Sequence, residues 1–96
     1  MITSKQRSKL RALANQVPSL FQLGKGGVNE AFIAQIDDLL TKRELIKISV
    51  LETSPISAKE AAVQVSEATQ SEIVQVIGRK FALYRQNLEA PQIVLK

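Results

Sequence analysis

The chain has 96 residues and a formal net charge of +4, and it contains neither histidine nor cysteine. Without cysteine there are no disulfides or thiolate metal sites, and without histidine the usual general base and a common metal ligand are missing. We therefore expect a binding protein, with no catalytic residue, metal, cofactor or small-molecule substrate. No apolar run approaches the ~20 residues of a membrane-spanning helix, and the start of the chain lacks the apolar segment of a secretory signal. A cytoplasmic location is the default expectation.

Basic side chains are concentrated at the beginning of the chain. The first 28 residues contain five basic residues and no acid, whereas the other 68 contain eight basic and nine acidic residues. The five are Lys5, Arg7, Lys9, Arg11 and Lys25. A charge run is often only a solvated helix surface, but four cations on one helix without interleaved acids favour a polyanionic partner.

A first helix is predicted to begin at a Thr3 or Ser4 cap and to run to about Gln16. Its apolar residues repeat at helical spacing and predict the buried side. They are Leu10, Leu13, Ala14 and Val17. Lys5 and Lys9 would line one flank of this helix, and Arg7 and Arg11 the other.

The remaining pattern predicts two more helices and four strands. Strands are expected at Ser19–Leu23, Leu45–Glu52, Glu72–Ile77 and Lys80–Arg85, and helices at Glu30 to about Lys42 and Ser57 to about Thr69. Gly78 and Arg79 would form a type II′ turn between the last two strands. Residues 86–96 are expected to be a largely irregular tail.

The order of elements is thus α-β-α-β-α-β-β. Strands separated by helices favour parallel pairing with right-handed crossovers, and the closing hairpin adds an antiparallel neighbour. We therefore predict one α/β domain over residues 1–96, with helices packed on a four-stranded mixed sheet in two layers. The predicted strand order is 1-2-4-3.

The segment Gly24-Lys25-Gly26-Gly27 lies between the first predicted strand and the second predicted helix. Glycines permit positive φ and let the backbone N–H groups be exposed, while a helix N-terminus adds unpaired donors and partial positive charge. Together with the Lys25 ammonium, this arrangement suits a phosphate group.

Three alternatives compete for this glycine segment. A nucleotide-binding P-loop requires G-x-x-x-x-G-K-[ST], which the chain does not contain. A dinucleotide fingerprint requires G-x-G-x-x-G, and Asn29 occupies the position of its third glycine. A tight strand-to-helix connection, with glycine needed only for geometry, remains open.

Three blocks together resemble a known family. They are the Leu10-x-x-Leu13-Ala14 helix, the Gly24-Lys25-Gly26-Gly27-Val28 loop, and Ile77-Gly78-Arg79 leading into Leu83-Tyr84-Arg85. The chain resembles the free-standing bacterial form of the CRM domain (chloroplast RNA splicing and ribosome maturation), the YhbY-like proteins. The resemblance covers nearly the whole chain and implies an RNA-binding fold similar to the C-terminal domain of translation initiation factor three. It also implies association with precursors of the large ribosomal subunit.

The family's glycine loop is likened to the GxxG loop of KH domains, which clamps a nucleic-acid backbone. A KH loop joins two helices, whereas this loop is expected to join a strand to a helix, so the likeness covers chemistry rather than topology. The family's segment after Leu-Tyr-Arg is often basic, but residues 86–90 carry a net negative charge, which argues against a C-terminal contact with RNA.

The function predicted from these observations is recognition of an RNA backbone, with ribosomal RNA as the implied partner and the protein acting as a monomer. The predicted RNA-binding residues are Gly24, Lys25, Gly26, Gly27, Lys5, Arg7, Lys9, Arg11, Arg79 and Lys80. Tyr84 is a candidate for base stacking, but a lone tyrosine in a strand is more often part of the core. The alternative function is a small protein-interaction module that docks acidic partners through the basic helix.

Overall fold

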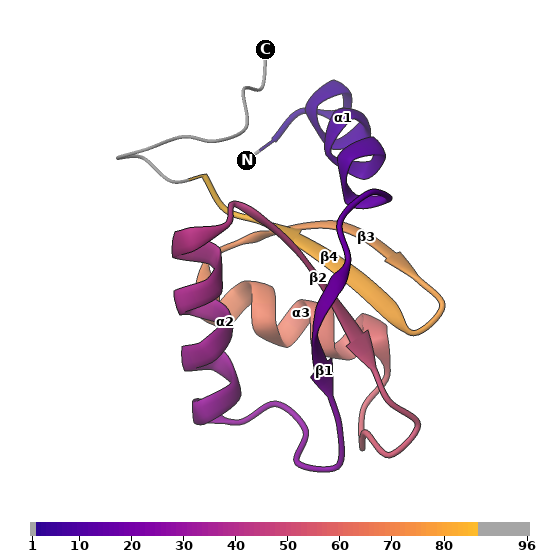
Figure 1. Ribbon diagram of the computed structural model, residues 1–96, viewed down its shortest axis with the longest axis vertical. Helices are drawn as coiled ribbons and strands as arrows, with labels where there is room; N and C mark the ends of the chain where they lie inside the picture. The colour runs from indigo at the N-terminus through magenta and orange to yellow at the C-terminus, as the bar shows by residue number, and fades with distance from the viewer. Residues whose placement is uncertain (1, 87–96) are drawn as a thin grey trace.

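The computed structural model describes residues 2–86 of the chain and contains three helices and four strands (Figure 1). The elements are α1 (Ser4–Ala14), β1 (Ser19–Leu23), α2 (Glu30–Lys42), β2 (Leu45–Val50), α3 (Ala58–Thr69), β3 (Glu72–Ile77) and β4 (Lys80–Tyr84). This confirms the predicted order. The prediction of an irregular tail falls almost entirely on residues 87–96, which lie outside the described residues.

The four strands form one mixed sheet in the order β1-β2-β4-β3, as predicted. β1 pairs in parallel with β2, and β4 lies antiparallel to both β2 and β3. Gly78 has a φ of +58° at the first position of the β3–β4 turn, and Arg79 at the second position does not have a positive φ. This is the pattern of the predicted type II′ turn.

One face of the sheet packs against α2 and α3. Phe32, Ile36 and Leu40 of α2 recur at helical spacing, and they meet a row of small side chains on α3. The strands contribute alternate residues to this cluster, namely Leu23, Ile46, Ile48, Val50, Phe81 and Leu83. Sheet, α2 and α3 thus form the predicted two-layer body.

Helix α1 packs on the opposite face of the sheet and covers only one end of it (Figure 1). Leu10 and Ala14 are fully buried there against a second cluster of strand residues. Those strand residues are Leu45, Val74, Ala82 and Tyr84. The rest of this face has no helix above it among the described residues.

Several local predictions need correction. Helix α1 ends at Ala14 rather than near Gln16, where the chain makes a turn before Pro18. On α3, Ala68 is exposed although it lies three residues after the buried Val65, and Thr69, four residues after Val65, is buried. The Thr69 hydroxyl donates to the carbonyl of Val65 at 2.7 Å, which satisfies its polar group inside the core.

Arg85, directly after β4, joins the ends of two helices to the sheet. Its guanidinium donates to the backbone oxygens of Asp37 and Thr69, each at 2.9 Å, to the Thr41 hydroxyl at 3.0 Å and to the Asp37 carboxylate. Five fixed donors let one arginine serve several acceptors. Arg85, which belongs to one of the motifs quoted above, is therefore engaged within the protein.

Within residues 2–86, no helix is both long enough and apolar enough to cross a membrane.

Candidate nucleic-acid interface

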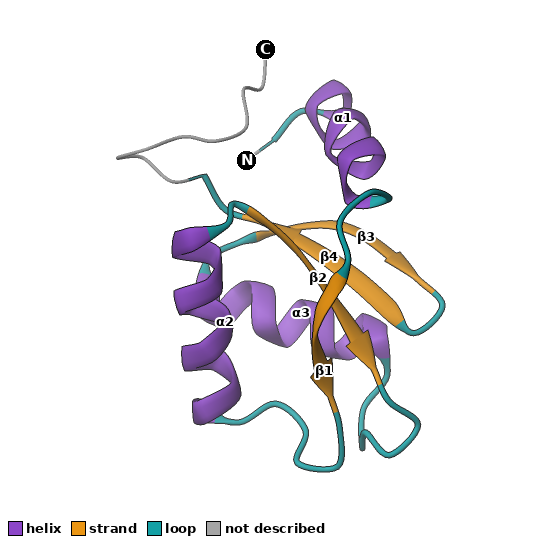
Figure 2. Cartoon of the chain, in the orientation of Figure 1, coloured by secondary structure: helices purple, strands orange, loops and turns teal. Residues whose placement is uncertain are grey.

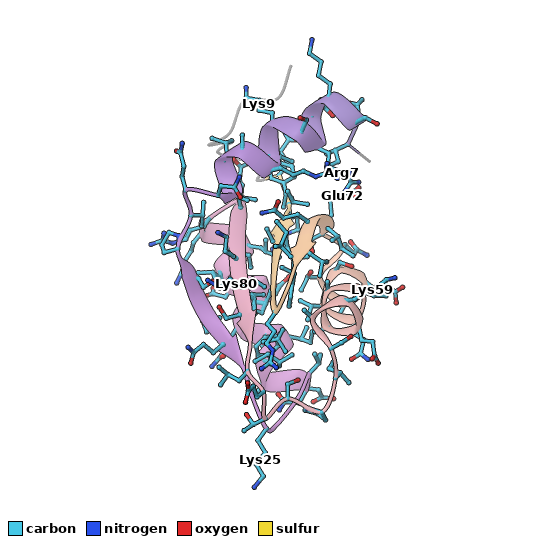
Figure 3. The ribbon with its side chains drawn as sticks, turned by 90° about the vertical axis from the view of Figure 1, so that its right-hand side faces the viewer. Arg7, Lys9, Lys25, Lys59, Glu72 and Lys80 are labelled. Atoms are coloured by element: carbon cyan, nitrogen blue, oxygen red, sulfur yellow. The ribbon has the colours of Figure 1, made fainter. Side chains whose placement is uncertain are left out.

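The glycine segment forms a tight turn with Lys25 at its tip. The N–H of Gly27 donates to the carbonyl of Gly24 at 3.0 Å, which closes a four-residue turn with Lys25 and Gly26 in the middle. The side chain of Lys25 is exposed and extends away from the body of the protein at one end of the long axis (Figure 3). It makes no ion pair with the described residues, so its full charge is available to a ligand.

Only one of the three loop glycines has the positive φ that the sequence suggested for the segment. Gly27 has a φ of +63°, and a Cβ built there would lie 3.0 Å from the Pro55 ring. Gly24 and Gly26 do not have a positive φ, and added Cβ atoms would make only ordinary contacts. The geometry of a tight strand-to-helix connection therefore explains why position 27 is a glycine. It does not explain the glycines at Gly24 and Gly26.

Helix α2 begins directly behind this turn. Asn29 caps it, because its side-chain oxygen accepts from the N–H of Phe32 at 2.8 Å. The turn thus joins a strand to a capped helix, as expected from the sequence. The N–H groups of Lys25 and Gly26 form no hydrogen bond with another described residue, and such unpaired donors next to a helix N-terminus are suited to an anion.

The β3–β4 hairpin lies at the same end of the sheet as the glycine turn (Figure 2). The N–H of Val50, at the end of β2, donates to the carbonyl of Arg79 at 2.6 Å, which fixes the hairpin tip beside that end. The Arg79 guanidinium pairs with the Glu52 carboxylate at 3.1 Å, and both side chains are largely exposed. Arg79 is therefore partly neutralised, whereas Lys80 is exposed and has no ion pair with the described residues.

The two arginines of α1 both contact β3, although Arg7 is half-buried and Arg11 is exposed. Arg7 donates to the carbonyl of Ile73 and lies 3.9 Å from the Glu72 carboxylate, while Arg11 Nε lies 3.4 Å from the carbonyl of Val74. The register of β3 against β4 shifts between Ile73 and Gln75, so Val74 is an extra residue without a partner on β4. The arginines thus fasten α1 to β3.

The two lysines of α1, Lys5 and Lys9, are exposed. Helix α1, which carries them, lies at the opposite end of the molecule from Lys25, and the longest dimension is 38 Å (Figure 3). The strands therefore bring the Lys25 turn and the hairpin of Arg79 and Lys80 to the same end of the sheet, with Lys80 nearer the middle of the long axis, and α1 lies at the other end (Figure 3).

Tyr84 has no surface on which a base could stack. Its side chain is 4% exposed and belongs to the cluster under α1. Burial raises the pKa of its phenol, and the nearby Glu44 carboxylate raises that pKa further. Tyr84 is therefore a core residue, which was the alternative to base stacking.

Lys47 is a candidate that the sequence interpretation missed. It lies in the middle of β2 between the buried residues Ile46 and Ile48, and its neighbour on the same side of the strand is Ser49. The signal was present, because a polar residue that alternates with buried apolar ones must point to the other face of the sheet.

The fold thus defines a small α/β domain with exposed cations at three places, which are a strand–helix turn, a hairpin and a terminal helix. The chain belongs to the CRS1/YhbY (CRM) domain family, whose model matches residues 2–85. This confirms the family resemblance seen in the sequence.

Individual relatives cover nearly the whole chain. It is 41% identical over 95 residues to the Bacillus subtilis protein named "Probable RNA-binding protein YqeI", with 99% of each chain covered. It is 30% identical over 89 residues to an RNA-binding protein of Haemophilus influenzae, covering 93% of this chain and 90% of that protein. The solution structure of SAV1595 from Staphylococcus aureus, a protein proposed to bind RNA, matches with a TM-score of 0.83, 50% identity and full coverage of both chains.

The conformation of the glycine turn predicts different tolerance at neighbouring positions. We expect Gly27→Ala to lower the free energy of unfolding by roughly 1–2 kcal/mol, because a Cβ is strained at positive φ and would press on Pro55. The matched control Gly26→Ala should change it by less than about 0.5 kcal/mol. Urea unfolding measures both, and equal effects would contradict the assigned backbone conformation.

The contacts of α1 predict a structural role for its arginines. Replacing Arg7 by Ala should lower the free energy of unfolding by roughly 1–2 kcal/mol, because the Ile73 carbonyl loses a charged donor. Lys5→Ala removes one charge from the same helix and should change stability by less than about 0.5 kcal/mol. Thermal or urea unfolding distinguishes them, and a stability loss confined to Lys5→Ala would refute the orientation of α1.

Proposed function

We propose that this protein binds RNA by contacting its phosphate backbone through the turn of Gly24, Lys25, Gly26 and Gly27. The observation that carries this proposal is the exposed ammonium of Lys25 at a turn whose middle N–H groups, like that ammonium, have no partner within residues 2–86, in a chain of the CRM family. The relatives named as RNA-binding proteins support the same partner. A flexible ammonium and backbone donors recognise a phosphate without reading the base attached to it.

The side chains of the described residues favour backbone recognition over base recognition. The four aromatic residues of the chain are Phe21, Phe32, Phe81 and Tyr84; Phe21 is half-buried and the other three are buried. Sequence-specific recognition of single strands commonly stacks unpaired bases on exposed aromatic rings. We therefore propose a protein that binds RNA through phosphate geometry and charge.

The finer identity of the partner follows from the family resemblance. We propose that the RNA is ribosomal, in a precursor of the large subunit, and that the protein acts in the cytoplasm as a monomeric binding protein rather than as an enzyme. Lys80 and Arg79 would assist at the hairpin, with Arg79 the weaker contributor because Glu52 competes for it. On α1, the exposed Lys5 is better placed for RNA than Arg7, which is half-buried and engaged with β3.

The turn is tested by reversing one charge. Lys25→Glu should weaken binding to a labelled RNA hairpin by roughly tenfold at 0.1 M salt, because one phosphate contact is lost and a repulsive charge is added. The control Lys59→Glu makes the same change of charge on α3, on the other side of the sheet (Figure 3). Fluorescence anisotropy measures both, and equal weakening would show that only net charge matters.

The ribosomal partner is tested in cells. We expect ultraviolet crosslinking followed by sequencing of the bound RNA to recover mainly large-subunit ribosomal RNA, and recovery should fall in the Lys25→Glu strain. Recovery spread over messenger RNAs would contradict the ribosomal assignment while leaving RNA binding in place. Absence of salt-dependent RNA binding by the purified chain would instead favour the acidic-protein alternative.

A further inference from the structure

The sheet has an uncovered area between α1 and the end that carries the glycine turn. We call this area the open face. It consists of the residues that alternate toward the α1 side of the strands beyond the reach of α1, namely Gln22, Lys47, Ser49, Gln75, Ile77 and Lys80. The register places Ser49 opposite both Gln22 and Lys80, and Ile77 opposite Lys80, so these side chains share one surface.

The open face is basic and contains no acid. Lys47 and Lys80 form no ion pair with the described residues. They are diagonal neighbours on adjacent strands, since Lys47 lies opposite Ala82 and Lys80 lies two residues before it. Diagonal neighbours are roughly 7–8 Å apart, so two like charges are held near each other without a compensating carboxylate.

A shallow hollow of about 160 Å³ lies between these lysines. Asn15, just after α1, forms one wall, and its side-chain oxygen accepts from the Gln75 amide at 3.4 Å. Ile77 is 62% exposed and forms another part of the lining. In such a hollow the lysines can contact a phosphate and the amide groups a ribose hydroxyl. The exposed aliphatic side chain can contact the carbon atoms of the sugar.

The sheet separates the charges of the domain. The helices on the other face carry five acids and two lysines: Glu30, Asp37, Asp38, Glu60 and Glu67, with Lys42 and Lys59. The side of the open face carries the two lysines of that face, the basic residues of α1 and one strand acid, Glu72, which lies 3.9 Å from the Arg7 guanidinium. Figure 3 shows Lys80 and Lys59 on opposite sides of the sheet, with Lys9 and Lys25 at the two ends. A polyanion approaching this domain is therefore directed to the open face.

We propose that the RNA backbone crosses the open face, with Lys47 and Lys80 binding phosphates between the Lys25 turn and the exposed lysines of α1. This inference rests on the proposed RNA binding and defines the path of the RNA over the protein. A second copy of this chain is a poor occupant, because it would bring a second pair of lysines against the first. The path explains how basic residues at opposite ends of a 38 Å molecule serve one ligand.

The path is tested with the full chain and two RNA probes, a single-stranded 20-mer of uridine and an RNA hairpin with a duplex stem. For the double variant Lys47→Gln/Lys80→Gln, we expect the slope of log affinity against log salt to flatten by about 1.4 with the single strand, since each lost phosphate contact contributes about 0.7. When salt is lowered from 1 M to 0.1 M, the affinity of the parent should therefore rise about 25-fold more than the affinity of the double variant. Lys47→Arg/Lys80→Arg, which keeps both charges, should retain most of the parent slope.

The matched control is Lys42→Gln/Lys59→Gln, which removes two charges from α2 and α3 on the other face. We expect its slope to change by less than about 0.3, because those lysines do not lie along the RNA. Melting temperatures of all variants show that the fold is kept. Equal slopes in the Lys47/Lys80 variant and the control would overturn the path.

The outcomes separate the two proposals. If Lys25→Glu weakens binding and the Lys47/Lys80 variant binds like the parent, the path is wrong and the proposed function stands. If the parent binds neither probe in a salt-dependent way, the proposed function fails and the path with it. If only the hairpin responds to Lys47→Gln/Lys80→Gln, the path holds and the ligand of the open face is a duplex.

Discussion

Strand β4 buries side chains on both of its faces, and the layout of the domain depends on this strand. Phe81 and Leu83 point into the cluster under α2 and α3, whereas Ala82 and Tyr84 point into the cluster under α1. β4 lies between β2 and β3, and β2 beside it divides its side chains in the same way, with Ile46 in the first cluster and Leu45 in the second. Helix α1 reaches only the Tyr84 end of β4, so Lys80 at the other end remains exposed. The position of one helix thereby determines which part of the sheet can meet a ligand.

The arginines and the lysines of α1 differ in their contacts, in line with the chemistry of their side chains. Arginine presents several donors in a fixed plane, which suits backbone carbonyls at a strand edge, and Arg7 and Arg11 are used in this way. Lysine carries a compact charge on a flexible stem, and Lys5 and Lys9 are exposed, as is Arg11. The same helix is therefore attached to the sheet through its arginines, and its lysines extend into the solvent.

The fold was largely predictable because each element has a clear local signal. Asn29 and Ser57 cap their helices as expected, the alternation over Leu45–Val50 gives the central strand β2, and the turn at Gly78 orders the last two strands. The strand order followed from these elements and the preference for right-handed crossovers.

The site was less predictable, because sequence spacing does not say what lies opposite a side chain. Arg7 and Lys9 have the same local signal, and only the packing of α1 on β3 shows that Arg7 is engaged there. Likewise, the space beside Gly27 is limited by Pro55, which is 28 residues away in the chain, so that a Cβ there would lie 3.0 Å from the proline ring. The assignment of RNA-binding residues stays a prediction that the proposed measurements test.

The contact between α1 and β3 has a consequence for the behaviour of the protein at high concentration. β3 is an edge strand, and the outward carbonyls of such strands are templates on which a second chain can add a strand and start aggregation. Arg7 and Arg11 occupy the carbonyls of Ile73 and Val74, and the irregular register there further disturbs the edge. The basic helix therefore hinders the pairing of this strand with a second chain, so substitutions of its arginines should lower solubility as well as stability.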